Sequence, residues 1–124
     1  MKKLTYFLPA LIFYLLVFLF SSRDLGIHLN GGWLDKIPHG LEFALLAFLL
    51  AIGFFNSLGS SAQIKAAVTF IAGLLLAVLD ELHQSFVPGR TADARDILAD
   101  AVGVALGILV YTHFVKRSKR GATP

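Results

Sequence analysis

Four long apolar stretches, separated by short polar segments, constrain the fold of this chain more than any other feature. The first runs from Leu4 to Phe20 without a charged residue, and the others cover residues 37–56, 64–84 and 95–115. A helix as long as any one of these stretches spans roughly 25 Å or more, close to the ~30 Å hydrocarbon core of a bilayer. Membrane-spanning strands would instead alternate apolar and polar residues. We therefore predict an all-α integral membrane bundle of four transmembrane helices, forming one domain over residues 1–124.

The composition agrees with a membrane protein. Hydrophobic residues make up 56% of the chain and charged residues only 15%, against about 25% charged residues in soluble domains. So few polar side chains cannot cover the surface of a water-soluble domain. The chain contains no cysteine, which excludes disulfides, thiolate zinc sites and cysteine nucleophiles.

The first apolar stretch has an alternative interpretation as a secretory signal peptide, because it follows two lysines and precedes the polar sequence SSRD. Its apolar run is longer than the 7 to 15 residues of a typical signal-peptide core, and no A-x-A cleavage site follows it. We therefore predict an uncleaved first span.

The distribution of charge predicts the orientation. With a cytoplasmic N-terminus, seven cations and no acid fall on the inside, and four cations and all eight acids fall on the outside. The positive-inside rule favours this arrangement, which makes the chain a multi-pass protein of the cytoplasmic membrane with both termini in the cytoplasm and a basic tail over residues 116–124. The basic pI then reflects topology and requires no nucleic-acid partner. The inside cations are Lys2, Lys3, Lys65, Lys116, Arg117, Lys119 and Arg120; the outside cations are Arg23, Lys36, Arg90 and Arg95; the acids are Asp24, Asp35, Glu42, Asp80, Glu81, Asp93, Asp96 and Asp100.

Three polar groups come from helix ends that all lie on the predicted outer side. Within each group the residues share one helical face, since they are spaced three, four or seven residues apart. Asp35 is also suited to N-cap the second span. Ionisable residues at the membrane edge are costly and usually serve a site, so their convergence predicts a functional cluster. The groups are Asp35, His39 and Glu42; Asp80, His83 and Gln84; and Asp93, Asp96 and Asp100.

Asp100 lies about one turn inside the fourth span, where a charge facing lipid costs about 2.5 to 3.5 kcal/mol. The same face continues as Ala99, Gly103 and Gly107, a small-residue pattern typical of closely packed membrane helices. We therefore expect Asp100 to face the bundle and to have a cationic or donor partner. The available partners are Lys36, His39, His83, Arg90 and Arg95.

Carboxylates beside histidines suit several roles. One is general acid/base chemistry, for which Glu81, His83 and Asp96 are the candidate catalytic residues. Another is a divalent metal site, although no H-E-x-x-H or comparable spacing occurs and no cofactor is required. A third is an ion-pair network that locks the bundle without a ligand. His28 and His113 share no face with the three groups and are not included.

Three motifs together resemble the VanZ-like family of small integral membrane proteins. They are DKIPHGLEF, DELHQSFVPGR and D-x-x-x-D-x-x-G, in this order, and the resemblance covers residues 35 to 110. This sequence departs from the family pattern at Phe43, where a tyrosine is common, and at Asp100, where an asparagine is common. The matching positions are Asp35, Lys36, His39 and Glu42 in the first motif, Asp80, Glu81, His83, Gln84 and Arg90 in the second, and Asp96 and Gly103 in the third.

The resemblance implies a role in the cell envelope, because the founding member is associated with low-level resistance to the glycopeptide teicoplanin. We expect the outward-facing polar cluster, which also includes Asp93 and Asp100, to bind or modify a lipid-linked or cell-wall amphiphile. The chain's other partner is the lipid bilayer. Two alternatives remain: a structural or scaffolding membrane protein, and a small transporter or channel. The transporter is less favoured because the polar residues gather at one side of the membrane and do not line its depth.

Overall fold

The computed structural model describes residues 2–23 and 32–122, and the described residues form helices and no strands. Four helices are each long and apolar enough to cross a membrane, which confirms the all-α bundle with four spanning helices. Short 3₁₀ turns lead into the first two. The elements are η1 (Leu4–Phe7), α1 (Leu8–Ser21), η2 (Trp33–Asp35), α2 (Lys36–Ser57), α3 (Ala62–Gln84) and α4 (Ala94–Gly121).

Large apolar side chains cover the outside of every helix. Leu19 of α1, Leu41 of α2, Leu75 of α3 and Leu109 of α4 are each 60% to 66% exposed. A soluble monomer rarely exposes apolar patches of such extent. The surface is therefore suited to lipid, as expected of a multi-pass membrane protein.

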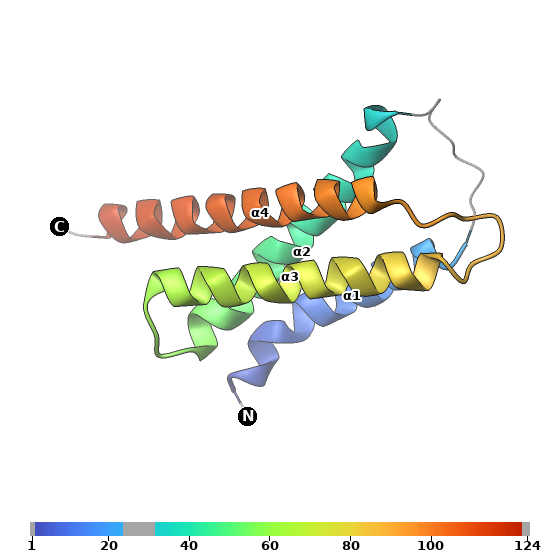
Figure 1. The fold of residues 1–124 in the computed structure, drawn as a ribbon. Coiled ribbons are helices and arrows are strands. Elements are labelled where there is room, and N and C mark those ends of the chain that lie inside the picture. Colours follow the sequence, from blue (N-terminus) through green and yellow to red (C-terminus); the bar gives the residue numbers. More distant parts are fainter. Residues whose placement is uncertain (1, 24–31, 123–124) are drawn as a thin grey trace.

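The two ends of the bundle differ in what they contain. Figure 1 shows both chain ends and the α2–α3 connection at one end, which we call the terminal end. At the opposite end α1 and α3 finish and α2 and α4 begin. We call this the polar end, because it carries the three polar groups predicted from the sequence.

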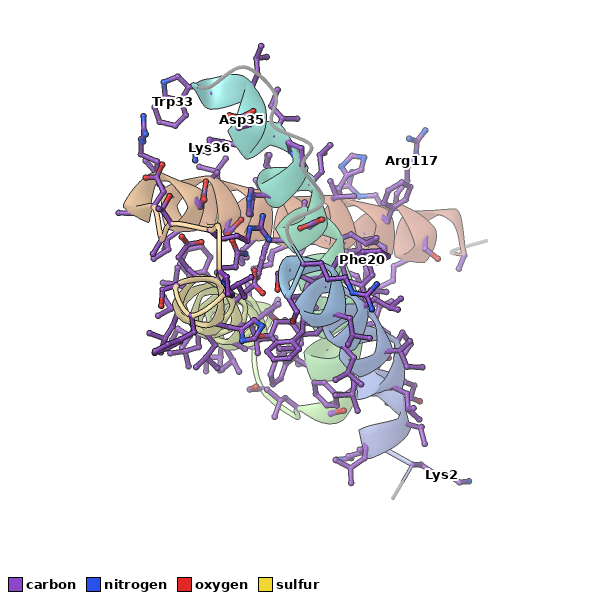
Figure 2. All side chains as sticks on the ribbon, turned by 90° about the vertical axis from the view of Figure 1, so that its right-hand side faces the viewer. Lys2, Phe20, Trp33, Asp35, Lys36 and Arg117 are labelled. Atoms are coloured by element: carbon purple, nitrogen blue, oxygen red, sulfur yellow. The ribbon has the colours of Figure 1, made fainter. Side chains whose placement is uncertain are left out.

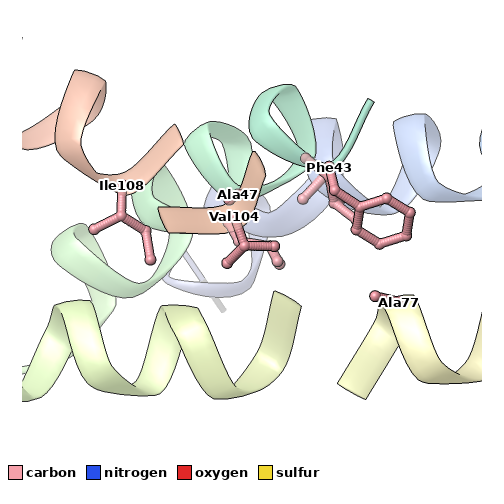
Figure 3. Packing of buried hydrophobic residues seen from close by; sticks show 8 residues of the cluster. Phe43, Ala47, Ala77, Val104 and Ile108 are labelled. Atoms are coloured by element: carbon pink, nitrogen blue, oxygen red, sulfur yellow. The ribbon is translucent and has the colours of Figure 1, made fainter. Parts of the chain in front are cut away.

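The core lies around α2, which packs against each of the other three helices. Phe43 and Ala47 of α2, Ala77 of α3, and Val104 and Ile108 of α4 are buried in one cluster. Figure 3 shows Val104 between α2 and α3. This apolar contact fixes the relative positions of the three helices that carry most of the predicted polar residues.

The backbones of α2 and α4 come into close contact. A Cβ atom added at Gly103 would overlap the backbone of Gly40, and one added at Gly107 would overlap the carbonyl oxygen of Ala44. Small residues allow such an approach in lipid, where van der Waals packing drives helix association. The crossing brings the first turns of α2 and α4 together at the polar end.

Two helix starts differ from the sequence prediction. Asp35 precedes α2, but its side chain makes no capping hydrogen bond, so the predicted N-cap is wrong. The physical reason is that η2 runs directly into α2 and gives Asp35 a helical backbone (φ −68°, ψ −18°), whereas capping side chains need an extended one. At α1, Leu8 N–H bonds to Thr5 in a 3₁₀ turn, because Pro9 has no N–H to continue the α-helical pattern.

The last helix is longer than the span predicted for it. α4 continues to Gly121, beyond residue 115, and its last turn carries Lys119 and Arg120. Cations near a helix C-terminus interact favourably with the helix dipole. The described part of the basic segment is therefore helical.

Candidate functional site

Lys36 joins the first turn of α2 to the start of α4. Its Nζ lies 2.5 Å from Oδ1 of Asp96 and 3.0 Å from Oδ2 of Asp93. The side chains of Lys36 and Asp96 are only 13% and 10% exposed. Figure 2 shows Lys36 directed toward the start of α4, below Trp33 and Asp35. A partly desolvated ion pair of this kind is screened less by water than a surface pair.

His39 lies between the two deeper aspartates of α4. Its Nε2 is 3.9 Å from Oδ2 of Asp96, and its Nδ1 is 3.9 Å from Oδ1 of Asp100. These distances suit ion pairing but are too long for hydrogen bonds. One imidazole thus faces a carboxylate on each of its nitrogens.

Asp100 is the most deeply buried carboxylate of this group, with a side chain that is 2% exposed. Among the described residues, neither Asp100 Oδ1 nor His39 Nδ1 has a hydrogen-bond partner. The expectation that Asp100 faces the bundle is met by its burial, but His39 at ion-pair distance is the only partner found for it in the described ranges. An unpaired buried acceptor costs about 1 to 3 kcal/mol, and more when charged.

Glu81 connects α3 to the start of α4. The backbone N–H of Asp93 donates to Glu81 Oε1 at 2.5 Å, and Glu81 is 4% exposed. Asp93 also N-caps α4 by accepting from the Arg95 N–H at 2.9 Å. Hydrogen bonds from the Arg95 guanidinium, from the Arg95 backbone and from Lys36 hold the pKa of Asp93 well below its usual range. Asp93 therefore stays ionised where the three elements meet.

A second polar group fastens α1 to α3. Asp80 accepts hydrogen bonds from the Ser21 hydroxyl and the Gln84 amide, both at 2.7 Å. Arg90 donates to the backbone carbonyl of Ser21 at 3.0 Å. Both oxygens of the buried Asp80 carboxylate therefore have partners, and this group has the character of a structural tie.

His83 makes a separate contact with the end of α1. Its Nε2 lies 2.8 Å from the Ser22 hydroxyl, and its ring stacks on Phe18 at 4.0 Å between centroids. Ser22 also donates to the Phe18 carbonyl at 2.7 Å. Because that bond uses the hydroxyl proton, Ser22 accepts from His83, and this pair is not arranged as a nucleophile and its base.

The predicted residues thus divide unequally. Lys36, His39, Asp96 and Asp100 lie together between α2 and α4, and we call these four residues the α2–α4 site. Asp80, His83 and Arg90 contact the end of α1 instead, and Gln84 donates to Asp80. Glu81 and Asp93 connect α3 to α4.

Four other residues considered in the sequence analysis lie apart from the α2–α4 site or outside the described residues. Glu42 is exposed and makes no hydrogen bond or ion pair within residues 2–23 and 32–122. His113 is exposed on α4 and contacts Phe114. Asp24 and His28 fall outside the described residues.

Sequence reasoning missed the two serines at the end of α1. Ser21 contacts Asp80 and Ser22 contacts His83, yet the stretch SSRD was weighed only as part of a signal peptide. The sequence contains a feature that could have predicted these contacts: two adjacent serines end an apolar span on the side that carries the acids.

The described residues hold no group of three or more histidine or acidic side chains placed to bind a metal ion. The α2–α4 site does combine a carboxylate pair, an imidazole and an ammonium group in a partly desolvated setting. Such a set can bind a polar group or exchange protons with it.

The comparisons with known proteins identify the family. The model of the VanZ/LLP1 family matches residues 1–116. The chain belongs to the VanZ/LLP1 family. No curated protein and no solved structure matches it.

The two departures from the VanZ-like pattern now have structural settings. Phe43 is fully buried in the core, so the aromatic ring at this position serves packing between α2, α3 and α4. Asp100 places a carboxylate at the base of the α2–α4 site. In this VanZ/LLP1 protein Phe43 therefore belongs to the core and Asp100 to the α2–α4 site.

Proposed function

We propose that this VanZ/LLP1 protein lies in the cytoplasmic membrane with both termini in the cytoplasm and its polar end at the outer face. The charge distribution supports this orientation. All seven cations assigned to the inside belong to segments at the terminal end, namely the two ends of the chain and the first turn of α3. The positive-inside rule favours retention of such an end in the cytoplasm.

We further propose that the polar end binds or modifies a lipid-linked or cell-wall amphiphile and thereby changes susceptibility to teicoplanin-type glycopeptides. The observation that carries this proposal is the α2–α4 site with its buried, unpaired Asp100 oxygen. A buried polar group without a partner lowers the stability of the fold, and such groups are commonly found where a ligand binds.

The test is to replace His39 and Asp96 singly with alanine in the native host, verify accumulation in the membrane, and measure teicoplanin susceptibility and lipid composition. Glu42→Ala is the matched control, because it removes an exposed carboxylate from the same end of the bundle. We expect changed susceptibility in the first two variants and wild-type behaviour in the control. Wild-type behaviour in all three would refute the site.

A second candidate function is that of a structural membrane protein whose polar residues only fix helix packing. The full pairing of Asp80 and the contact of Glu81 with the α4 backbone favour it. It predicts that any loss of function in the His39→Ala and Asp96→Ala variants follows a loss of thermal stability. A variant as stable as wild type but without function would count against it.

A further inference from the structure

We infer that Asp100 and His39 bind a primary ammonium group carried by the ligand. The inference rests on the proposed binding function and names the chemical class of its ligand. It depends on three features of the polar end: its excess of negative charge, the unpartnered atoms Asp100 Oδ1 and His39 Nδ1, and the depth at which they lie.

The fixed charges of the polar end favour a cation. The described part of this end carries seven carboxylates against four Lys and Arg side chains. Lys36 is already paired with Asp93 and Asp96, so it offers little attraction to an anionic ligand. The carboxylates are Asp35, Glu42, Asp80, Glu81, Asp93, Asp96 and Asp100, and the cations are Arg23, Lys36, Arg90 and Arg95.

The excess of negative charge gathers around Asp100. Asp96 and Asp100 each place a carboxylate oxygen 3.9 Å from a nitrogen of the same imidazole, that of His39. A phosphate or carboxylate entering here would be repelled, whereas an ammonium group would be attracted in a setting less screened than water. The acidic side chains are not arranged as metal ligands in the described ranges, which favours an organic cation.

The unpartnered atoms fit an N–H donor. Asp100 Oδ1 and His39 Nδ1 lie 3.9 Å apart. If a nitrogen lies ~2.8 Å from both atoms, the angle at that nitrogen between the two atoms is roughly 90°. This angle is near that between two N–H bonds of an ammonium group. His39 Nδ1 accepts from the ammonium group in the tautomer that carries its proton on Nε2, the nitrogen that faces Asp96.

The depth of the site suits an amine near the lipid headgroups. Asp100 is six residues beyond Ala94, the first residue of α4, which places it about 9 Å along the helix. His39 is 17% exposed, whereas Asp100 is 2% exposed. The ammonium group therefore approaches from the polar end past His39.

The experiment compares phosphatidylethanolamine with phosphatidylcholine, whose headgroup has the same charges but no N–H. The full chain is placed in nanodiscs of equal amounts of both lipids, and the lipids retained after release into detergent are quantified by native mass spectrometry. We expect at least about tenfold enrichment of phosphatidylethanolamine, which Asp100→Asn abolishes and Glu42→Gln preserves. Asp100→Asn keeps the size of the side chain, and circular dichroism of each variant verifies its fold.

Equal retention of the two lipids, preference for phosphatidylcholine, or unchanged enrichment in Asp100→Asn would overturn the inference. Soluble ethanolamine is the second probe. Displacement of the retained lipid by ethanolamine supports a site for amines in general, and enrichment without displacement supports a lipid-borne amine.

The outcome separates the ligand class from the proposed function. No amine preference together with changed teicoplanin susceptibility in Asp96→Ala would overturn the ligand class alone. No amine preference and no change in susceptibility would overturn both.

Discussion

Asp80 and Asp100 lie at the same end of the bundle but differ in whether their carboxylates are hydrogen-bonded. Asp80 is buried with both carboxylate oxygens hydrogen-bonded, to Ser21 and Gln84. Asp100 is equally buried, but its Oδ1 has no hydrogen-bond partner among the described residues. The same residue type thus stabilises the fold at one position and costs stability at the other.

This contrast predicts opposite effects of substitution. Asp80→Ala should lower the free energy of unfolding by about 1 to 3 kcal/mol, because it leaves the buried Gln84 amide without its acceptor and removes the link from Ser21 to α3. Asp100→Asn should leave the unfolding temperature equal to or above that of wild type, since Asp100 Oδ1 makes no hydrogen bond that the substitution would remove. Thermal unfolding in detergent, followed by circular dichroism, measures both. A marked destabilisation by Asp100→Asn would contradict this account of the site.

Asp93 gives a prediction for the dependence of stability on pH. Its pKa in the folded protein lies below the ordinary value of 3.8, because it accepts hydrogen bonds from Arg95 and Lys36. A carboxyl with a lowered folded-state pKa stabilises the fold above its unfolded pKa, and this contribution is lost as the pH falls toward the folded value.

The unfolding temperature of wild type should therefore exceed that of Asp93→Asn at pH 7 and pH 5, and the difference should shrink as the pH falls below about 4. Thermal unfolding at a series of pH values in one detergent measures it. A difference that stays constant down to pH 3 would show that the Asp93 charge does not contribute.

At the scale of helices, the contact between α2 and α4 determines where the site forms. Gly103 and Gly107 let the backbones touch, and Lys36 then meets Asp96 at the first turns. A larger residue at the crossing would separate the two helices and with them the site.

Gly103→Ala should therefore destabilise the protein by about 1 to 3 kcal/mol, the usual cost of overpacking. The expected sign is the reverse of the ordinary effect, since alanine favours helix over glycine by about 1 kcal/mol. Gly121→Ala, near the end of the same helix where an added Cβ meets nothing, is the control. Denaturation of both variants in detergent measures the difference, and equal stabilities would argue against the close crossing.

The helices were predictable from the sequence because long apolar runs leave few alternatives in a membrane. The gathering of Lys36, His39 and Asp96 at one end was likewise predictable, since these residues sit at helix ends on one side. Which polar side chains would pair with each other was not predictable. Arg90, for example, donates to the backbone carbonyl of Ser21 and not to a carboxylate. Such choices depend on the rotation of α1 against α3, which no local pattern encodes.

At the scale of the whole molecule, charge is divided between the two ends. The polar end holds all seven acids of the described residues, and the terminal end holds seven cations in segments without an acid. The absence of cysteine makes the proposed orientation directly measurable, because one introduced cysteine is the only reactive thiol.

Thr91→Cys, at the polar end, should react with a membrane-impermeant maleimide in intact cells. Ala122→Cys, at the terminal end, should react only after the membrane is permeabilised. Both positions are exposed, so accessibility of the side chain does not limit either reaction. Labelling of Ala122→Cys in intact cells would mean that the orientation is the reverse.

The unequal lengths of the helices have a consequence for the bilayer around them. The shortest span, Leu4–Ser21, has 18 residues, and α4 has 28, which correspond to about 27 Å and 42 Å. Only the apolar part of a helix has to match the thickness of the hydrocarbon layer. Since the excess length of α4 carries Lys116, Arg117, Lys119 and Arg120, this helix extends out of the hydrocarbon layer, and α1 sets the thickness that the protein prefers.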